Sequence, residues 1–330
     1  MAAVWKEIRH WLEWLGLAAV TKFIPLLPRS GCLELAKIAG TLAAKFDGRG
    51  RQVALENLRV AFGDRYSATE RETIMRESYQ HFTRSMLDLF WSPRLTSANW
   101  TRYVDVSQFE ASYGTALTDG HPFIMACYHY SNFEWLSLAS AFRGYRGSII
   151  NQEFKNPRLD AIFKKLREQS GHQMVAREGG IIRLYKTLRR GGRAAILVDL
   201  TIPPKIPTVA IECFGLKTSV TFAHAWLHER TGAPIITAHC EPMADGVYRI
   251  VAHRKLELPP GASLQEIAQA CWDNFEPYVR ANPAPWLWMY KHWRYRPADA
   301  DRAAYPFYAN FSEDFEKRLA EANRHAEPSA

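Results

Sequence analysis

Residues 123–142 read FIMACYHYSNFEWLSLASAF, and they change character in the middle. The first six residues are an apolar run, which breaks at His129 and resumes as an amphipathic stretch. A short apolar run that gives way to helical periodicity predicts a buried strand, a turn and then a helix. The strand is expected to end near Tyr128, and Ser131 or Asn132 is a natural N-cap for the helix.

His129 and Glu134 lie on either side of that turn, in the pattern H-x4-E. On one continuous helix, five residues rotate through about 500°, so the two side chains would point roughly 140° apart. They converge only if His129 precedes the helix, which places Glu134 in the first turn, where the helix dipole favours a carboxylate. A histidine backed by a carboxylate can act as a general base on a hydroxyl. The alternative is a half-buried histidine beside a capping glutamate.

The rest of the chain alternates short apolar runs with helical periodicity after about residue 101. The predicted strands are 122–128, 147–151, 193–198, 234–240 and 247–252. The predicted helices between and after them are 131–142, 157–169, 178–190, 219–231 and 263–281. Apolar strands bounded by helices indicate an α/β fold with a largely parallel sheet. Asp245-Gly246 favours a hairpin between the last two strands, so the sheet is expected to be mixed.

Three regions follow from this pattern. Residues 1–100 are expected to form a helical, membrane-associating region, in which Ser67 and Glu70 form a capping box. Residues 101–297 are expected to form the α/β domain, and 298–330 a polar C-terminal tail. The segment 11–28 is apolar but is interrupted by Glu13, Lys22 and Pro25. It favours an interfacial helix over a spanning one, with a helix packed on the core as the alternative.

Composition narrows the choice of partners. The net charge of +8 and the pI of about 9.2 indicate an anionic partner: nucleic acid, anionic lipid or an acidic carrier protein. The five cysteines are scattered without a C-x-x-C pair, which is typical of reduced core thiols. We therefore expect no metal and no cofactor. No cleavable signal is expected at the N-terminus either, because no small-residue cleavage site follows an apolar run.

The block HYSNFEW resembles the H-x-x-N-W-E block of the late acyltransferases of lipid A biosynthesis, within the wider H-x4-D/E glycerolipid and lysophospholipid acyltransferases. Other segments resemble the same family in order and at about the expected spacing. They are LPRS, ALENLRVAFG, KNPRLD, LRRGGRAAILVDL, CFG, ERTGAPIITAHC and PWLWMYKHWRYRP. Together they span residues from about 15 to 297, so the resemblance covers most of the chain.

The resemblance implies an acyltransferase that forms no covalent enzyme intermediate. In that reaction His129 would deprotonate an acceptor hydroxyl, which attacks the thioester of an acyl carrier protein. Glu134 would orient His129, and Asn132 resembles the polar residue of the family between them. The implied acceptor is a phosphorylated glycolipid, a lipid A precursor, at the cytoplasmic face of the inner membrane. The absence of G-x-S-x-G agrees with a mechanism that uses no serine nucleophile.

Further candidate substrate-binding residues follow the predicted strands. Asp199 ends a strand and leads into a Pro-rich loop with Lys205, where ligands of open α/β sheets bind; a turn aspartate is the alternative. Arg177 resembles an arginine of the family that would steady Glu134 or an anionic substrate. The stretch NQEFKNPRLD departs from the Y-R-P of the family, because Asn151 and Gln152 stand in the region of its basic residue. Lys155 and Arg158 are the candidate replacements there, and a solvated helix start is the alternative.

The segment 286–297 alternates aromatic and basic residues. RNA would use the rings for stacking and the cations for phosphates, whereas a lipid-facing edge would place both at headgroup depth. No RNA-binding motif accompanies the segment, so a lipid-facing edge or a place in the core is favoured, and nucleic acid is not expected as a partner.

The basic residues themselves are unevenly distributed. Residues 141–193 contain 13 Lys and Arg and four Asp and Glu. This segment directly follows the H-x4-E helix, so its cations are expected near the mouth of the site, where they suit an acidic acyl carrier protein. Solvated helix faces are the alternative for these cations. Two alternatives remain open. They are acylation of another lipid (a phosphatidylinositol mannoside, an ornithine lipid or a lysophospholipid) and a non-catalytic lipid-binding protein on the same fold.

Overall fold

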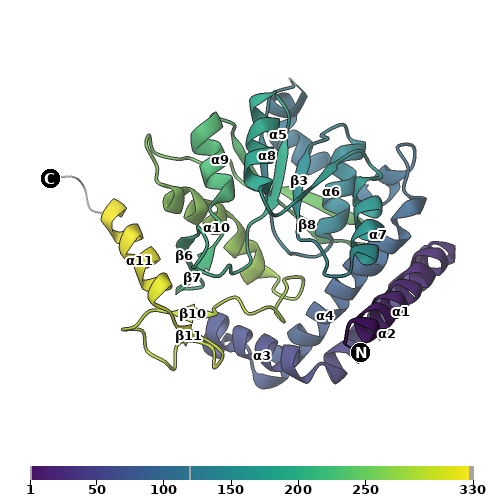
Figure 1. Cartoon of the computed structure of the whole chain (residues 1–330), viewed down its shortest axis with the longest axis horizontal. Coiled ribbons are helices and arrows are strands. Elements are labelled where there is room, and N and C mark those ends of the chain that lie inside the picture. The colour runs from purple at the N-terminus through teal and green to yellow at the C-terminus, as the bar shows by residue number, and fades with distance from the viewer. Residues whose placement is uncertain (1, 119, 327–330) are drawn as a thin grey trace.

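The computed structural model describes residues 2–118 and 120–326. Four helices come first: α1 (Ala2–Phe23), α2 (Arg29–Phe46), α3 (Gly48–Phe62) and α4 (Ala68–Trp91). The predicted capping box at the start of α4 is confirmed, because the Ser67 side chain accepts from the Glu70 N–H while the Glu70 carboxylate accepts from the Ser67 N–H. In Figure 1 these helices run along the lower side of the α/β region. Helix α4 packs directly on α6 (Phe133–Phe142) of the α/β region. The division into three regions stays a prediction.

A seven-stranded sheet forms the centre of the molecule, in the order β1-β9-β8-β2-β5-β3-β4. Its strands are β1 (Val104–Asp105), β2 (Ile124–Cys127), β3 (Ser148–Asn151), β4 (Gln173–Ala176), β5 (Ala194–Leu197), β8 (Ile235–Pro242) and β9 (Tyr248–Ala252). Neighbouring strands pair in parallel except β8 and β9, which form the expected antiparallel hairpin. The mixed, mainly parallel sheet is thus confirmed.

Helices cover both faces of this sheet (Figure 1). They are α5 (Ser107–Thr118), α6 (Phe133–Phe142), α7 (Pro157–Glu168), α8 (Gly180–Arg189), α9 (Ala223–Thr231) and α10 (Leu264–Ala281), and α11 (Glu313–Ala326) lies near the C-terminus. Alternate side chains of β2 divide the core between the two faces. Met125 and Cys127 pack with α6, while Ile124, Ala126 and Tyr128 pack with the helices of the other face.

Some strands carry no clear sequence pattern. The four residues of β4 begin with an exposed Gln173, so their apolar run is short. A separate hairpin joins β6 (Val209–Cys213) to β7 (Leu216–Val220). Its turn is Phe214-Gly215, with φ of 53° and 80°, so this part of the CFG motif is a two-residue turn with positive φ at both positions. The last strands, β10 (Tyr295–Arg296) and β11 (Asn310–Phe311), pair with each other.

Two sequence expectations about composition are resolved by burial. All five cysteines are buried and free. The tryptophans of segment 286–297 lie in the core rather than at a lipid-facing edge, since Trp286, Trp288 and Trp293 are fully buried. In the described part of the chain, no helix combines the length and apolarity needed to cross a bilayer.

Candidate active site

Strands β2 and β5 bring the central pair of the site together. They are parallel neighbours in which Cys127 is aligned with Leu197. His129 and Asp199 each lie two residues beyond those aligned positions, so they emerge side by side at the carboxyl edge of the sheet. This edge is where open α/β sheets place their ligands. The predicted break before the helix is also present, because α6 begins at Phe133 with Asn132 as its N-cap.

The carboxylate that contacts the imidazole belongs to Asp199. His129 Nδ1 lies 2.8 Å from Asp199 Oδ1, and the His129 backbone N–H donates to Asp199 Oδ2 at 2.9 Å. When Nδ1 carries the proton toward the carboxylate, Nε2 presents its lone pair as an acceptor for a proton. The side chain of His129 also lines the cavity described below. The pair therefore has the geometry of a general base held by a carboxylate.

Asp199 itself is firmly held. Its side chain is fully buried, and the Trp286 indole N–H donates to Oδ2 at 2.9 Å. Burial works to raise the pKa of Asp199, but the charge and hydrogen bond of His129 together with the Trp286 N–H hold that pKa below its ordinary value. A carboxylate kept ionised in this way stabilises an imidazolium when His129 takes up a proton.

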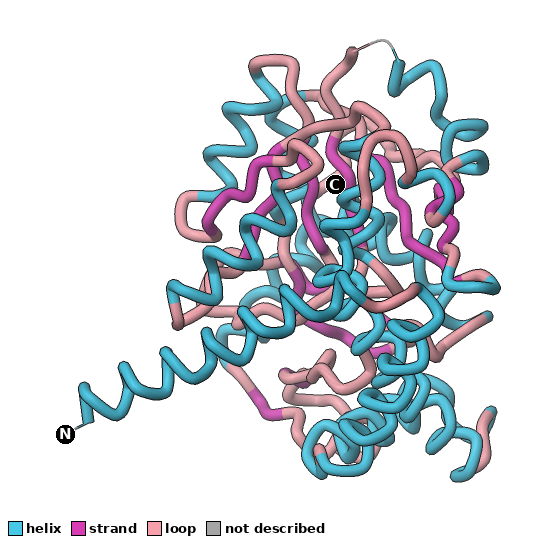
Figure 2. Tube along the Cα trace, turned by 90° about the vertical axis from the view of Figure 1, so that its right-hand side faces the viewer, coloured by secondary structure: helices cyan, strands magenta, loops and turns pink. Residues whose placement is uncertain are grey.

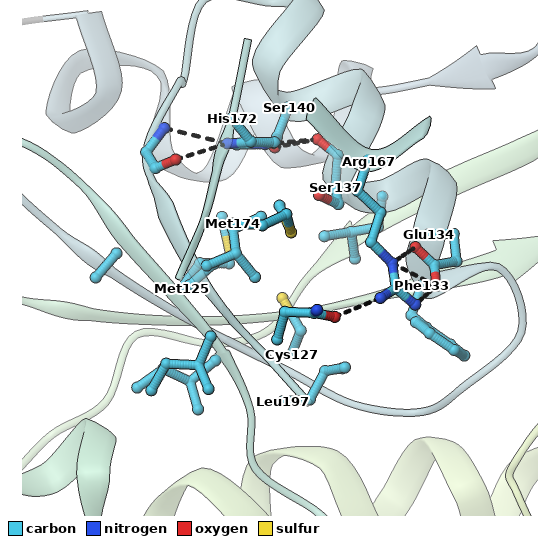
Figure 3. A pocket seen from close by; sticks show the side chains of 18 of the residues that line it. Met125, Cys127, Phe133, Glu134, Ser137, Ser140, Arg167, His172, Met174 and Leu197 are labelled. Atoms are coloured by element: carbon cyan, nitrogen blue, oxygen red, sulfur yellow. Dashed lines mark hydrogen bonds and ion pairs between the residues drawn. The ribbon is translucent and has the colours of Figure 1, made fainter. Parts of the chain in front are cut away.

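Glu134 differs from the expectation that it would back His129. Within the described residues, its carboxylate receives every one of its hydrogen bonds from Arg167 of α7, from Nε at 3.0 and 3.2 Å and from Nη2 at 2.5 Å. Arg167 Nη1 also donates to Asn151 Oδ1 at 2.5 Å. Figure 3 shows Arg167 beside Glu134 at the cavity wall. Burial works to lower the pKa of Arg167, but Glu134 holds it above its ordinary value, so the two form a buried ion pair.

A cavity of about 410 Å³ extends from His129 along the sheet. One wall consists of apolar side chains of β2, β3, β4 and β5, including Met125, Met174 and Leu197, and the other is α6 (Figure 3). Its far end reaches His172, whose Nε2 lies 2.8 Å from the Ser137 carbonyl oxygen and 3.1 Å from Ser140 Oγ. Burial lowers the pKa of His172. The cavity is thus a mainly apolar slot that begins at the imidazole.

The other predicted site residues lie at or outside the rim of the cavity. Arg177 is exposed, and its Nη1 donates to Gln152 Oε1 at 2.9 Å rather than to Glu134. Lys155 and Lys205 are exposed as well, in the segment before α7 and the loop after Asp199. The guanidinium of Arg158 contacts α1 instead, with Nη1 3.3 Å from Glu7 and its centre 4.5 Å from the Trp11 ring. The structure therefore brings Arg158 to a helix–helix contact and leaves the other three cations exposed, outside the cavity lining.

The sequence reading missed Arg167, although a signal was present. Phe163, Leu166 and Arg167 follow a helical spacing that places them on one face of α7, and the first two are buried. A cation on the inward face of a helix needs a carboxylate partner. Trp286 gave no comparable signal, since its donor role depends on the distant Asp199.

The basic segment 141–193 does not gather at the mouth as a whole. Arg189 and Arg190 lie five and four residues before the first residue of β5, Ala194, which is aligned with Ile124 of β2. His129 lies five residues beyond Ile124, which corresponds to about 15 Å along a strand. These two arginines therefore lie toward the amino edge, whereas Arg177 and Arg183 lie just beyond the carboxyl end of β4 and in the first turn of α8. The expectation that the whole segment lies at the mouth is therefore corrected: Arg167 and Arg193 line the cavity, Arg177 and Arg183 lie at the carboxyl edge of the sheet, and Arg189 and Arg190 lie toward the other edge.

Together, the fold and the site define an α/β protein with an imidazole–carboxylate pair at the mouth of an apolar cavity. The profile of the bacterial lipid A biosynthesis acyltransferase family matches residues 4–295. The chain belongs to this family, and the resemblance seen in its motifs is confirmed. A search of curated proteins gave no match.

Proposed function

We propose that the protein transfers a fatty acyl chain from acyl carrier protein to a hydroxyl of a lipid A precursor, with His129 as the general base. The observation that carries this proposal is the His129–Asp199 pair at the mouth of the apolar cavity. The pair supplies a base that a passive lipid-binding protein does not need, and the cavity suits an acyl chain. Family membership in lipid A biosynthesis supports the class of acceptor.

The reaction follows from this geometry. His129 Nε2 takes the proton of the acceptor hydroxyl while the oxygen attacks the thioester carbonyl carbon. Asp199 stabilises the imidazolium that forms. The tetrahedral intermediate collapses with cleavage of the carbon–sulfur bond, and the imidazolium returns its proton to the departing thiolate. Glu134 and Arg167 form an ion pair in the lining of the same cavity as His129. Glu134 therefore contributes to the site without contacting the imidazole.

The membrane is the proposed source of the acceptor. Helix α1 exposes apolar side chains at helical spacing, and Figure 2 shows it projecting from the body with the N-terminus near its tip. These side chains are Val4, Trp5, Ile8, Trp11, Leu12 and Leu15. A second exposed stripe follows α2 at Leu35, Ile38, Leu42 and Phe46. Exposed cations such as Lys6 and Arg9 accompany the first stripe, a combination suited to an anionic membrane interface.

The first prediction tests the reaction. Purified protein is incubated with lauroyl- or myristoyl-loaded acyl carrier protein and a lipid A precursor. The mass of the lipid product is then measured by mass spectrometry. The expected product carries one added acyl chain. His129→Ala should reduce the rate by about 10² to 10⁴-fold, and Asp199→Asn should cause a comparable loss because an amide fixes the wrong tautomer.

Glu134→Gln is the matched comparison for those variants. It should lose less activity than Asp199→Asn, since it does not contact the imidazole in the structure. A His129→Ala rate within a few-fold of wild type would refute the mechanism. Transfer to a phosphatidylinositol mannoside, an ornithine lipid or a lysophospholipid, with none to the lipid A precursor, would favour the other acceptors. Binding of the lipid without any transfer would favour the lipid-binding protein.

The second prediction concerns the donor. Reversing Arg177 and Arg183 to Glu should raise the KM for acyl carrier protein several-fold with little change in kcat, because the carrier is acidic and these cations lie at the carboxyl edge. Reversing Arg189 and Arg190 is the matched control at the other edge and should change the KM less. Equal use of acyl-coenzyme A, with no response of the KM to charge reversal or salt, would contradict a carrier-protein donor.

A further inference from the structure

Arg29 of the LPRS motif has a buried role that the reaction above does not use. It is the first residue of α2, and its guanidinium packs against Asp88 of α4. Nη1 donates to Asp88 Oδ1, and Nη2 donates to Asp88 Oδ2 at 3.0 Å. The Asp88 side chain is fully buried, and 13% of the Arg29 side chain is exposed. A bidentate pair of this kind fixes the orientation of the carboxylate.

The same carboxylate reaches the segment that carries His129. Asp88 Oδ2 accepts from Asn132 Nδ2 at 2.8 Å and from the Tyr248 hydroxyl at 2.6 Å. The other end of the Asn132 amide caps α6, because its Oδ1 accepts from the Trp135 N–H at 2.9 Å. Asn132 therefore joins two elements with one side chain: the start of α6 and the buried carboxylate of α4.

Residues 129–132 need this restraint because the backbone is strained at Ser131. Ser131 has a φ of 49°, in the left-handed region that residues other than glycine rarely adopt. Such a conformation persists only where its surroundings hold it from several sides. Three contacts do so here: the His129 N–H on Asp199 at 2.9 Å, the Ser131 N–H on the Pro285 carbonyl at 2.9 Å, and the Asn132–Asp88 bond.

We propose that Arg29 and Asp88 are positioning residues that aim His129 through Asn132. Arg29 orients the Asp88 carboxylate, Asp88 holds the Asn132 amide, and Asn132 fixes the far end of the strained 129–132 segment. Among the described residues that line the cavity, neither Arg29 nor Asp88 is present, so neither contacts its contents directly. Both also contact Trp135 of α6, through the Arg29 guanidinium 4.7 Å from its ring and the Asp88 carbonyl that accepts from its indole N–H. The inference rests on the proposed role of His129. It makes α2 and α4 part of the catalytic unit, in addition to any role at the membrane.

The test separates this relay from helix capping. In Asn132→Ser, the hydroxyl still caps α6 about as well as asparagine does, but the donor to Asp88 is lost. The kcat should fall by about 10 to 100-fold, because small displacements of reacting groups are costly. The KM for acyl carrier protein and the melting temperature should stay close to wild type. Arg29→Lys keeps the charge but not the fork, so its kcat should fall between those of Asn132→Ser and wild type.

Tyr79→Phe is the matched control for a lost contact of α4. This substitution removes the hydrogen bond that the Tyr79 hydroxyl of α4 donates to Asp47 at 2.8 Å. Asp47 is the N-cap of α3 and contacts neither Asn132 nor Asp88 in the structure, so the kcat should match wild type. If Asn132→Ser keeps the wild-type kcat while His129→Ala is inactive, the relay is overturned and the proposed function stands. If His129→Ala is also fully active, the proposed function itself fails. A lower melting temperature with an unchanged kcat per folded molecule would assign Asn132 a structural role and overturn the relay.

Discussion

Two tryptophan-rich segments of this chain look alike in sequence and differ in the burial of their tryptophans. Residues 5–14 and 286–293 each contain three tryptophans among basic residues. In α1 the side chains stay at the surface, with Trp5 69% and Trp11 47% exposed, whereas Trp286, Trp288 and Trp293 are fully buried. The buried indoles also have polar partners, since Trp286 donates to Asp199 and Trp288 to the Pro283 carbonyl.

This difference shows what determines whether a tryptophan is buried or exposed. An indole is apolar except for its N–H, so it is usually buried where a hydrogen-bond acceptor is available for that N–H. Segment 286–293 has such acceptors, because Asp199 just beyond β5 and the Pro283 carbonyl lie within hydrogen-bonding distance of its indoles. Among the hydrogen bonds of the described residues, none has an indole N–H of α1 as its donor. The exposed rings of α1 would therefore suit the headgroup region proposed above.

The largest effect is expected when the exposed tryptophans of α1 are replaced. Trp5→Ser combined with Trp11→Ser should weaken binding to vesicles of anionic phospholipid by about 1 to 3 kcal/mol, since two half-exposed rings lose their apolar contact. The unfolding midpoint should change little, because these rings bury little surface in the protein. Flotation with vesicles at low and high salt measures the first effect, and urea denaturation measures the second.

Two results would contradict the proposal that Trp5 and Trp11 contact a membrane. Wild-type protein that does not float with vesicles at low salt would show that the exposed stripe serves another contact. A large loss of folding stability in the double variant would place Trp5 and Trp11 with the buried group. The matched control is Trp14→Ser, because Trp14 is only partly exposed and stacks edge-on against Trp11 at 5.3 Å.

The fold could be predicted from the sequence where the signal is local, and not where it depends on contacts between distant residues. Strands such as 124–127 and 235–242 were found because continuous apolar runs signal buried parallel strands. The His129 loop was found because a helix could not bring Glu134 back to it. The partner of His129, however, lies 70 residues away in sequence. Only the adjacency of β2 and β5 brings Asp199 to the imidazole, and no local pattern encodes that adjacency.

Arg167 was missed for the same reason, since its partner Glu134 lies 33 residues earlier. The sequence nevertheless placed both carboxylates in the site. What it could not assign was which carboxylate contacts the imidazole. Spacing along the chain favoured Glu134, whereas spacing across the sheet selects Asp199. Pairings between strands are tertiary information, so the structure was needed to exchange the two roles.

The smallest expected effect tests the buried segment at one atom. Trp286→Phe keeps an aromatic ring in the core but removes the N–H that donates to Asp199 Oδ2 at 2.9 Å. Of the donors to Asp199 within the described residues, the two from His129 remain, so the proposed base stays in place. The kcat should therefore fall only about 3 to 10-fold, or roughly 1 kcal/mol. Trp272→Phe is the matched control, because Trp272 lies in the same aromatic cluster, 5.5 Å from Trp286, but donates to Glu276 outside the site. Steady-state kinetics at matched folded fraction compares the two. If both variants lower kcat equally, the loss comes from core packing, and Trp286 has no separate role in holding Asp199.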